Sequence, residues 1–181
     1  MRADLRLEGT LLGHRVTVRP FRPDEAERVW ELASGLDRSI MPTPPDRHRM
    51  RRRVERSGRM VSGEIDLAIE AEGRLVGDIQ THRAPRRALR PGVFELGIVI
   101  YAPEDRGHGW GSEAIALFTS WLFERAGATR VQAATGAANE AMRRTLQKVG
   151  YGERGTLVEF ARDYVLYAVD AAEWQASRDV G

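Results

Sequence analysis

The sequence predicts one mixed α/β domain, and three observations lead to that prediction. The chain has 181 residues, a length that suits a single domain. Hydrophobic residues make up 42% of the chain, enough for a sizeable core, and no tract has a disordered composition. Periodic patterns follow one another as strand, two helices, three strands, helix, strand, helix and two strands. Because that order is not a regular βαβ series, we expect a mixed sheet flanked by helices.

The first part of the chain is predicted to form a strand and two helices. Residues 15–19 alternate between polar and apolar side chains, which is typical of a strand. A helix follows, with acidic residues in its first turn to complement the helix dipole, and Gly35 ends it. After a proline-rich breaker at residues 42–45, a second and very basic helix is expected over residues 46–57.

The middle of the chain is predicted to be β-structure. Residues 65–69 and 75–79 alternate and flank a Glu-Gly turn, which is typical of a β-hairpin. A basic loop over residues 82–92 leads to a longer strand, which we expect over residues 93–101.

The last part of the chain is predicted to contain two helices and three strands. Apolar residues recur at helical spacing over residues 111–126. Asn139 is placed to cap another helix, over residues 140–149. The remaining predicted elements are strands, over residues 129–134, 156–160 and 164–169.

Composition excludes several classes of site. The chain has no cysteine, which excludes a disulfide scaffold, a thiolate metal site and a cysteine nucleophile. The net charge is +2, and Lys148 is the single lysine, so the arginine content reflects a compositional bias. Residues 1–6 contain no apolar signal segment, and the longest apolar run, residues 96–102, is far shorter than the ~20 residues of a membrane helix. We therefore expect a cytoplasmic protein, and no histidine pair with a carboxylate suggests a metal.

A glycine-rich loop, Arg-Gly-His-Gly-Trp-Gly at residues 106–111, stands between a predicted strand and a predicted helix. Glycines allow close approach of a ligand, and the helix N-terminus offers N–H groups that suit a pyrophosphate. A Walker A loop would need Lys after the last glycine, where Ser112 and Glu113 stand. A dinucleotide fingerprint would need glycine at Ser112. A plain glycine-rich turn before a helix remains an alternative.

The loop resembles the phosphate loop of the GCN5-related N-acetyltransferases (GNAT), with the pattern Gln/Arg-x-x-Gly-x-Gly/Ala, because Arg106, Gly109 and Gly111 match its fixed positions. Residues 94–101 resemble the fourth strand of that family, and residues 139–151 resemble the helix whose first Asn touches the cofactor. Residues 163–167 with the following Glu-Trp resemble the ending of the RimJ/RimL branch, whose members acetylate protein N-termini.

The resemblance implies a single-domain GNAT fold with a mixed, mostly antiparallel sheet, over residues 13–174, between an extension at 1–12 and a tail at 175–181. It also implies acetyl-coenzyme A as cosubstrate, with no metal, and a homodimer. The implied cofactor-binding residues belong to the fourth strand, the loop and the later helix. They are Ile98, Val99, Ile100, Arg106, Gly107, His108, Gly109, Trp110, Gly111, Ser112 and Asn139.

For the general base we favour Glu95, on the strand that leads to the loop, with His82 as the alternative base. A satisfied strand carboxylate is the alternative interpretation of Glu95. In the family a tyrosine often acts as the general acid, and its position corresponds to Leu146 here. Met142 stands where the RimJ/RimL branch often has serine. The general acid is therefore unassigned, and a strand N–H near Ile98 is expected to stabilise the oxyanion.

The function predicted is transfer of an acetyl group from acetyl-coenzyme A to a primary amine, on a protein N-terminus or a small molecule. The alternative is a coenzyme A-binding regulatory module that catalyses weakly. The basic helix, residues 46–57, borders the acceptor site in the family and could attract an acidic partner, or it could be a solvated surface. No aromatic residue interleaves with its arginines, which argues against nucleic-acid binding.

Overall fold

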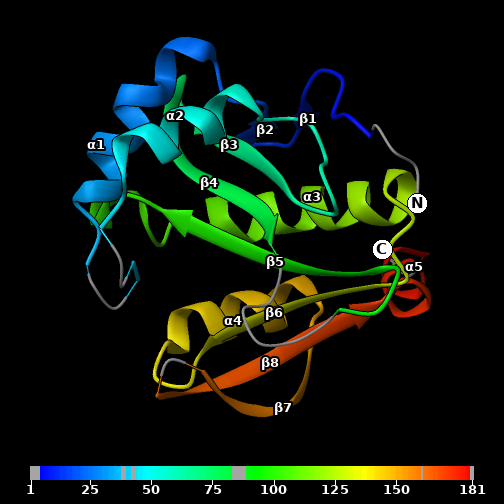
Figure 1. Ribbon diagram of the computed structural model, residues 1–181. Helices are drawn as coiled ribbons and strands as arrows, with labels where there is room; N and C mark the ends of the chain where they lie inside the picture. Colours follow the sequence, from blue (N-terminus) through cyan, green and yellow to red (C-terminus); the bar gives the residue numbers. More distant parts are fainter. Residues whose placement is uncertain (1–4, 38–39, 42–43, 83–88, 160, 180–181) are drawn as a thin grey trace.

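An eight-stranded mixed sheet runs through the computed structural model, with the strand order β1-β2-β3-β4-β5-β6-β8-β7 (Figure 1). The structure describes residues 5–37, 40–41, 44–82, 89–159 and 161–179. The strands are β1 (Leu11–Leu12), β2 (Val16–Arg19), β3 (Ile65–Ala71), β4 (Arg74–His82), β5 (Val93–Ile100), β6 (Arg130–Gly136), β7 (Gly152–Glu159) and β8 (Arg162–Asp170).

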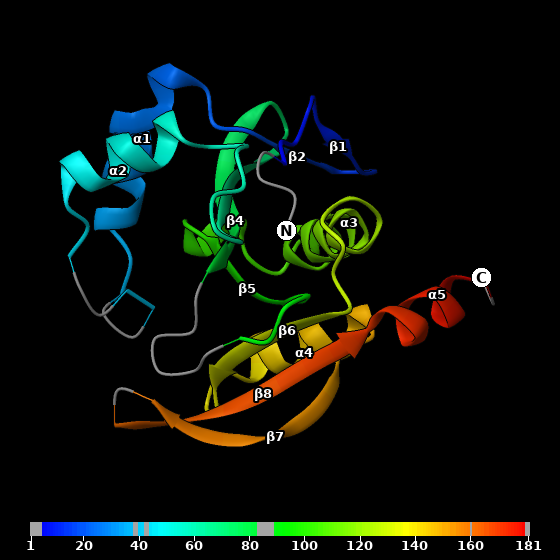
Figure 2. The same ribbon diagram turned by 45° about the vertical axis from the view of Figure 1, so that its right-hand side comes forward.

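Helices cover both faces of the sheet. They are α1 (Ala26–Ser34), α2 (Arg47–Glu55), α3 (Trp110–Arg125), α4 (Glu140–Val149) and α5 (Ala171–Asp179), with short 3₁₀ turns η1 (Pro23–Glu25) and η2 (Pro103–Asp105). Helices α1 and α2 lie on one face of the N-terminal half, and α3 lies on the other face (Figure 2). The main core forms between α3 and the sheet, where Ile115, Phe118 and Leu122 are fully buried. Met50 and Val54 of α2 pack in a smaller cluster with Ala68 of β3.

The sheet divides between β5 and β6. These two strands are parallel, whereas every other neighbouring pair in the described sheet is antiparallel. Their ladder has three pairs, and Glu95 with Gln132 is the last of them. Beyond that pair β5 continues beside β4 and β6 continues beside β8, so the two strands separate into a wedge. The mixed, mostly antiparallel sheet agrees with the predicted fold class.

Most predicted elements are confirmed. Helix α4 has the predicted bounds, and its cap residue Asn139 accepts a hydrogen bond from the backbone N–H of Met142 at 3.2 Å. Two elements were not predicted, namely β1 and α5, because a two-residue strand has no measurable period and α5 was interpreted as a tail. Parts of the predicted breaker and basic loop, residues 42–43 and 83–88, lie outside the described residues.

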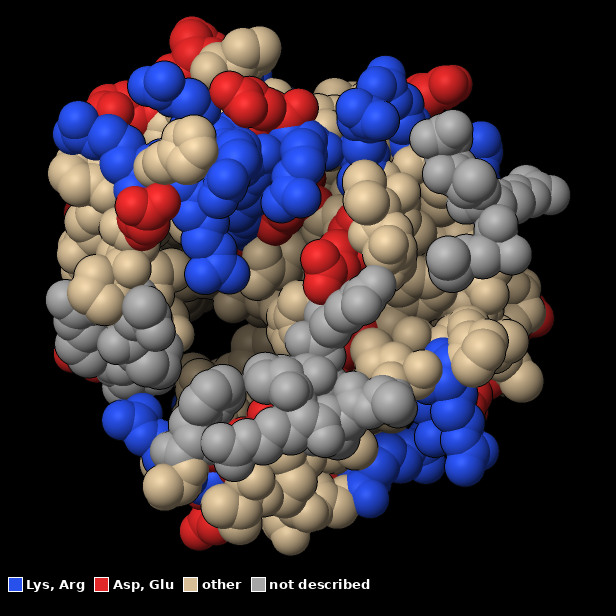
Figure 3. All heavy atoms as spheres, viewed as in Figure 1, with Lys and Arg blue, Asp and Glu red and all other residues tan. Residues whose placement is uncertain are grey.

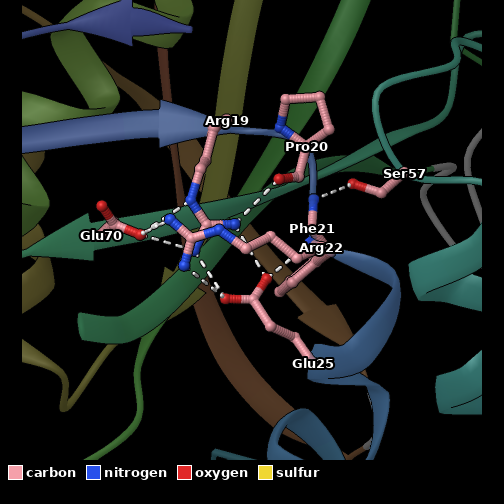
Figure 4. A network of polar contacts seen from close by, with 7 residues as sticks. All are labelled: Arg19, Pro20, Phe21, Arg22, Glu25, Ser57 and Glu70. Carbon is pink, nitrogen blue, oxygen red and sulfur yellow. Dashed lines mark hydrogen bonds and ion pairs between the residues drawn. The ribbon is translucent and has the colours of Figure 1, made fainter. Parts of the chain in front are cut away.

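A buried ion-pair network fixes the start of α1 against the sheet (Figure 4). The Arg19 guanidinium, at the end of β2, donates to Glu25 in η1 at 2.6 and 2.9 Å and to Glu70 of β3 at 2.7 and 3.0 Å. Glu25 also accepts from the backbone N–H of Arg22 at 2.6 Å. Because buried charges need partners, this network specifies how α1 enters the fold.

No described helix combines the length and the apolar content that crossing a membrane requires.

Candidate functional site

The glycine-rich loop joins η2 to α3 and turns twice through left-handed backbone. Gly107 has φ of 82°, and Gly109, the residue that caps α3, has φ of 81°. Left-handed backbone is readily adopted only by glycine, which explains both residues. The first N–H groups of α3 have no partner inside the helix and carry its positive dipole end. The loop therefore presents an anion-binding surface at Trp110, Gly111 and Ser112.

Arginine side chains support the loop from outside. Arg15 donates to the carbonyl oxygen of His108 at 2.8 Å, and its backbone N–H donates to Glu113 at 3.0 Å. Arg74 of β4 forms a bidentate pair with buried Asp105 at 2.6 and 2.8 Å. Hydrogen bonds from Arg74 hold the pKa of Asp105 below its usual range. This support fixes the loop before any ligand arrives.

The predicted cofactor residues Arg106 and His108 make contacts within the protein. Arg106 donates to the carbonyl oxygens of Ile100 at 3.2 Å and Tyr101 at 3.1 Å, which secures the end of β5. The His108 ring lies 3.0 Å from the Glu104 carbonyl oxygen and stacks on Trp110, with ring centroids 4.8 Å apart. Both side chains therefore shape the loop.

The backbone of β5 presents alternate N–H groups to the wedge. The N–H of Tyr101 donates to the carbonyl oxygen of Val76 on β4, at 3.0 Å. Since N–H directions alternate along an antiparallel strand, the N–H groups of Ile98 and Ile100 point away from β4, toward the wedge. The N–H of Val99 points toward β4, so of the three predicted strand residues it is the one whose amide does not face the wedge.

A cavity of about 820 Å³ opens where the strands separate. Its walls include His82 of β4, Gly97 and Ile98 of β5, and Met142 of α4. The other lining residues are Ile40, Leu96, Ala133, Ala134, Thr135, Gly136, Ala137, Ala138, Asn139, Arg162, Asp163 and Tyr164. Figure 3 shows the same face of the molecule hollowed below a group of arginines. The wedge therefore has room for a ligand beside the free edge of β5.

Glu95 lies at the apex of the wedge, with 2% of its surface exposed. Its carboxylate accepts a hydrogen bond from Gln132 of β6 at 2.7 Å. His82 is the cross-strand neighbour of Glu95 on β4 and lines the cavity. The His82 ring packs over Gly97, where an added Cβ would meet it at 3.0 Å. The fold thus places His82 in the cavity wall and Glu95 next to it on β5, where Glu95 is not itself one of the lining residues.

The two α4 residues at which related enzymes place polar side chains, Leu146 and Met142, point in different directions. Leu146 is fully buried in the main core, so its position does not face the cavity, whereas Met142 lines it. Tyr164 also lines the cavity. The Tyr167 hydroxyl is buried between Arg143 and Glu153, at 3.2 Å from each, so this tyrosine is a packing residue.

A buried polar cluster beside the site was not predicted. Arg53 of α2 donates to Asp66 at 2.6 Å, to Asp78 at 2.6 Å and to Gln80 at 2.7 Å. The Tyr101 hydroxyl donates to Asp78 at 2.5 Å, and burial, followed by the charge of Asp78, raises the Tyr101 pKa well above its ordinary value. In the sequence Arg53 is one arginine among several, and no local pattern distinguishes it.

A second cavity, of about 930 Å³, borders the loop on the outer side of α3. Gly109 and Ser112 line it together with the cationic side chains Arg15, Lys148 and Arg178. This cavity extends the positive surface of the loop.

Comparisons with known proteins agree with this geometry. The family model described as an acetyltransferase (GNAT) domain matches residues 15–152. A mycothiol acetyltransferase of Paenarthrobacter aurescens is 28% identical over 137 residues, which are 75% of this chain and 42% of that protein. A second, of Pseudarthrobacter chlorophenolicus, is 29% identical over 60% of this chain and 34% of that protein. The chain thus spans less than half the length of these curated relatives.

Solved structures share the fold at low identity. A GNAT-family acetyltransferase of Bacillus anthracis has a TM-score of 0.71 at 21% identity, covering 90% of this chain and 98% of that one. The aminoglycoside acetyltransferase AAC(6')-Ib, in complex with coenzyme A and kanamycin, has a TM-score of 0.74 at 16% identity, covering 90% and 99%. RimL, an alpha-N-protein acetyltransferase in complex with coenzyme A, has a TM-score of 0.71 at 12% identity, covering 90% and 98%. With the family model matching most of its length, the chain belongs to the GNAT acetyltransferase family.

Proposed function

We propose that the protein transfers an acetyl group from acetyl-coenzyme A directly to a primary amine. The observation that carries this proposal is the wedge between β5 and β6, which opens beside a helix N-terminus capped by left-handed Gly109. An anion site and an exposed strand edge in line with each other suit a ligand that has a pyrophosphate at one end and an extended amide chain at the other.

The residues present fit coenzyme A. The N–H groups at Trp110, Gly111 and Ser112 would hold the pyrophosphate, because they are unpaired and carry the helix dipole. The free N–H groups of Ile98 and Ile100 would pair with the amides of the pantetheine arm, as an added strand would. Asn139, at the start of α4, lines the opposite wall. When bound, the coenzyme supplies a thioester that is activated toward an amine.

The chain's own residues would supply positioning, charge stabilisation and proton removal. A β5 amide at Ile98 would donate to the oxyanion, in a site that holds both reactants in one geometry. Glu95 would accept the amine proton, directly or through a water molecule, from the apex of the wedge. His82 is the alternative base, because it lines the cavity and is the cross-strand neighbour of Glu95. Leu146 is buried and has no ionisable group, so the side chain at that position does not act as the general acid.

The acceptor would be an amine on a protein N-terminus or on a small molecule. The names of the relatives, which include mycothiol and aminoglycoside acetyltransferases, support an amine acceptor of some kind. Placement in the RimJ/RimL branch, the cytoplasmic location, the homodimer and the domain limits remain predictions from the sequence. The alternative function is coenzyme A binding with weak catalysis, which the absence of a side-chain acid at Leu146 favours.

Thiol release tests the proposal. The purified protein would be incubated with acetyl-coenzyme A and a panel of amines that includes peptides with free N-termini. Because the chain has no cysteine, its own side chains contribute no thiol signal. We expect amine-dependent release of coenzyme A. Thermal stabilisation by coenzyme A without thiol release for any amine would favour the binding module. If coenzyme A neither stabilised the protein nor was released in any reaction, the proposed cofactor site would be disproved.

A further inference from the structure

One side of helix α2 carries arginines that have no evident structural task. Arg49, Arg52 and Arg56, here called the arginine stripe, are exposed. None of the three forms an ion pair with a carboxylate in the part of the chain that the structure describes. Their neighbours on the helix differ: Arg47 pairs with Glu27 of α1 at 2.7 Å and covers Trp30, and Arg53 is buried against Asp66 and Asp78. Arg51 is also exposed and forms no ion pair in the described part of the chain, but it lies more than about 90° round the helix from each member of the stripe.

The stripe lies on the exposed side of α2, beside Arg53, which connects the helix to the strand that borders the cavity. At 100° per residue, Arg49 and Arg56 lie about 40° and 60° from Arg53 around the helix, and Arg52 lies about 100° from it. All three are on the side opposite buried Met50 and Val54. Arg53 reaches Gln80 of β4, and Gln80 is two residues from His82 on the same face of that strand. Two residues of strand span about 7 Å. Figure 3 shows positively charged side chains directly above the hollow.

We propose that the arginine stripe selects the acceptor, and that the acceptor is the free N-terminus of a polypeptide whose first residues are acidic. This inference rests on the proposed function and names its substrate class. The stripe runs over two turns of helix, about 10 Å, which an extended peptide of three or four residues spans and a small amine does not. An acidic segment would lie along the stripe while its amino group enters the cavity beside His82.

The surroundings of the stripe favour a peptide over a nucleic acid. Base stacking needs accessible aromatic side chains. Of the two aromatic residues that pack with α2 in the described chain, Phe21 is buried, and the Arg47 guanidinium lies 4.2 Å from the ring centroid of Trp30. Guanidinium groups bind carboxylates and phosphates equally well in bidentate geometry, so the lack of a stacking surface among the described residues is the observation that favours a peptide.

The test compares peptides that differ only in charge. Three peptides would begin with alanine followed by four Glu, four Gln or four Arg, none with a side-chain amine. Their turnover and their direct binding, by fluorescence polarisation with coenzyme A present, would be measured for the native protein. We expect KM and Kd of the acidic peptide to be lower than those of the neutral one by roughly 10-fold, with a difference that shrinks as salt rises.

Two variants assign the effect to the stripe. Replacing Arg49→Gln and Arg52→Gln together should raise KM for the acidic peptide roughly 5- to 10-fold at unchanged kcat. Arg125→Gln with Arg144→Gln, on α3 and α4 at the opposite face, removes the same charge and should change nothing. Arg52→Glu should reverse the preference toward the basic peptide, a gain that misfolding cannot produce.

Several outcomes would overturn the inference. Turnover with equal KM for the three peptides would reject it while leaving the proposed function intact. Stronger competition by a single-stranded oligonucleotide than by the acidic peptide would identify the stripe as a nucleic-acid surface instead. If no amine is turned over, the proposed function fails, and fluorescence polarisation then tests the stripe by itself. Binding of the acidic peptide to the native protein, lost in the double variant Arg49→Gln and Arg52→Gln, would keep the stripe as a docking surface for acidic peptides.

Discussion

Glu95 and His82 are cross-strand neighbours on β5 and β4, but they differ in what surrounds them. Glu95 is buried and accepts a hydrogen bond from Gln132, whereas His82 lines the open space. A base has to reach the proton it removes, directly or through one water molecule, and ionised carboxylates are strong acceptors. Glu95 therefore suits removal through water, and His82 suits direct removal.

Substitution of each residue distinguishes these routes. We expect Glu95→Gln, which keeps shape and can still accept from Gln132, to lower kcat by roughly 10²- to 10⁴-fold. His82→Gln should lower kcat less than tenfold if Glu95 is the base. Pre-steady-state thiol release and the midpoint of urea unfolding would be measured for both. A large loss of kcat in the His82 variant with a small loss in the Glu95 variant would identify His82, and not Glu95, as the general base.

At the residue scale the sequence identifies chemistry-bearing positions better than it identifies their partners. The glycines at 107 and 109 follow from the need for left-handed backbone, and both have it. The buried roles of Arg19 and Arg53 could not be predicted, because their partners Glu70 and Asp78 are on strands brought together only by folding. A charge in a sequence looks the same whether it is solvated or buried.

The loop between η2 and α3 acts as one element, and its two glycines provide a matched pair. An added Cβ at Gly109 would lie 2.9 Å from the Arg15 guanidinium, whereas at Gly107 nothing lies within 4 Å. Both positions have left-handed backbone, which costs an alanine about 1–2 kcal/mol. Only the change at Gly109 therefore disturbs the arginine that supports the loop.

We accordingly expect Gly109→Ala to weaken coenzyme A binding by roughly 10-fold or more, and Gly107→Ala to weaken it only a few-fold. Isothermal titration with coenzyme A gives both dissociation constants, and urea unfolding controls for the shared backbone strain. Equal loss of affinity in the two variants would mean that backbone strain alone, and not the Arg15 contact, controls the loop.

The ion-pair network of Arg19, Glu25 and Glu70, which connects β2, η1 and β3, predicts how the stability of the protein depends on pH. Burial raises the pKa of Glu25, but hydrogen bonds from the Arg19 side chain and the Arg22 backbone outweigh it, so the net pKa lies below its ordinary value. A carboxyl with a lowered pKa in the folded state stabilises the protein fully above its unfolded pKa, about 4.3. That contribution disappears as the pH falls through the lower, folded value.

Glu25→Gln should therefore cost about 1–3 kcal/mol of unfolding free energy at pH 7, typical for hydrogen bonds to charged groups. The difference between the variant and the native protein should shrink as the pH falls below the unfolded pKa and through the lower, folded pKa, where the native carboxyl also becomes neutral. Urea unfolding at pH 7 and pH 3 measures it, with exposed Glu31→Gln on α1 as control. A difference that does not depend on pH would contradict the charged network.

Whole elements were predictable where the sequence pattern was long enough. Helices α3 and α4 have apolar residues at helical spacing and clear end signals, and both agree with the prediction to within one residue. Strand β1 exists only because Leu11 and Leu12 pair with β2, and α5 because Trp174 finds a buried place beside Phe123. These two elements depend on tertiary contacts, which local patterns do not contain.

At the scale of the whole molecule, the wedge makes the two parts of the sheet depend on few direct contacts. Strands β1 to β5 and strands β6 to β8 meet through three ladder pairs, and helices α3 and α4 pack together behind them. A ligand in the wedge would contact both parts at once. A protein with such a construction should gain stability over its whole length when coenzyme A binds.

We expect coenzyme A at about 100 times its dissociation constant to add about 2.7 kcal/mol of stability. For a domain of this size that corresponds to a rise in Tm of roughly 5–10 °C. Hydrogen exchange should slow more at the amides of Ile98 and Ile100, which face the wedge, than at Val99, which faces β4 and should gain only the protection that the whole protein gains. Residue-resolved exchange by NMR separates these neighbouring amides. A rise in Tm with protection confined to residues 107–112 would place the ligand on the loop alone and outside the wedge.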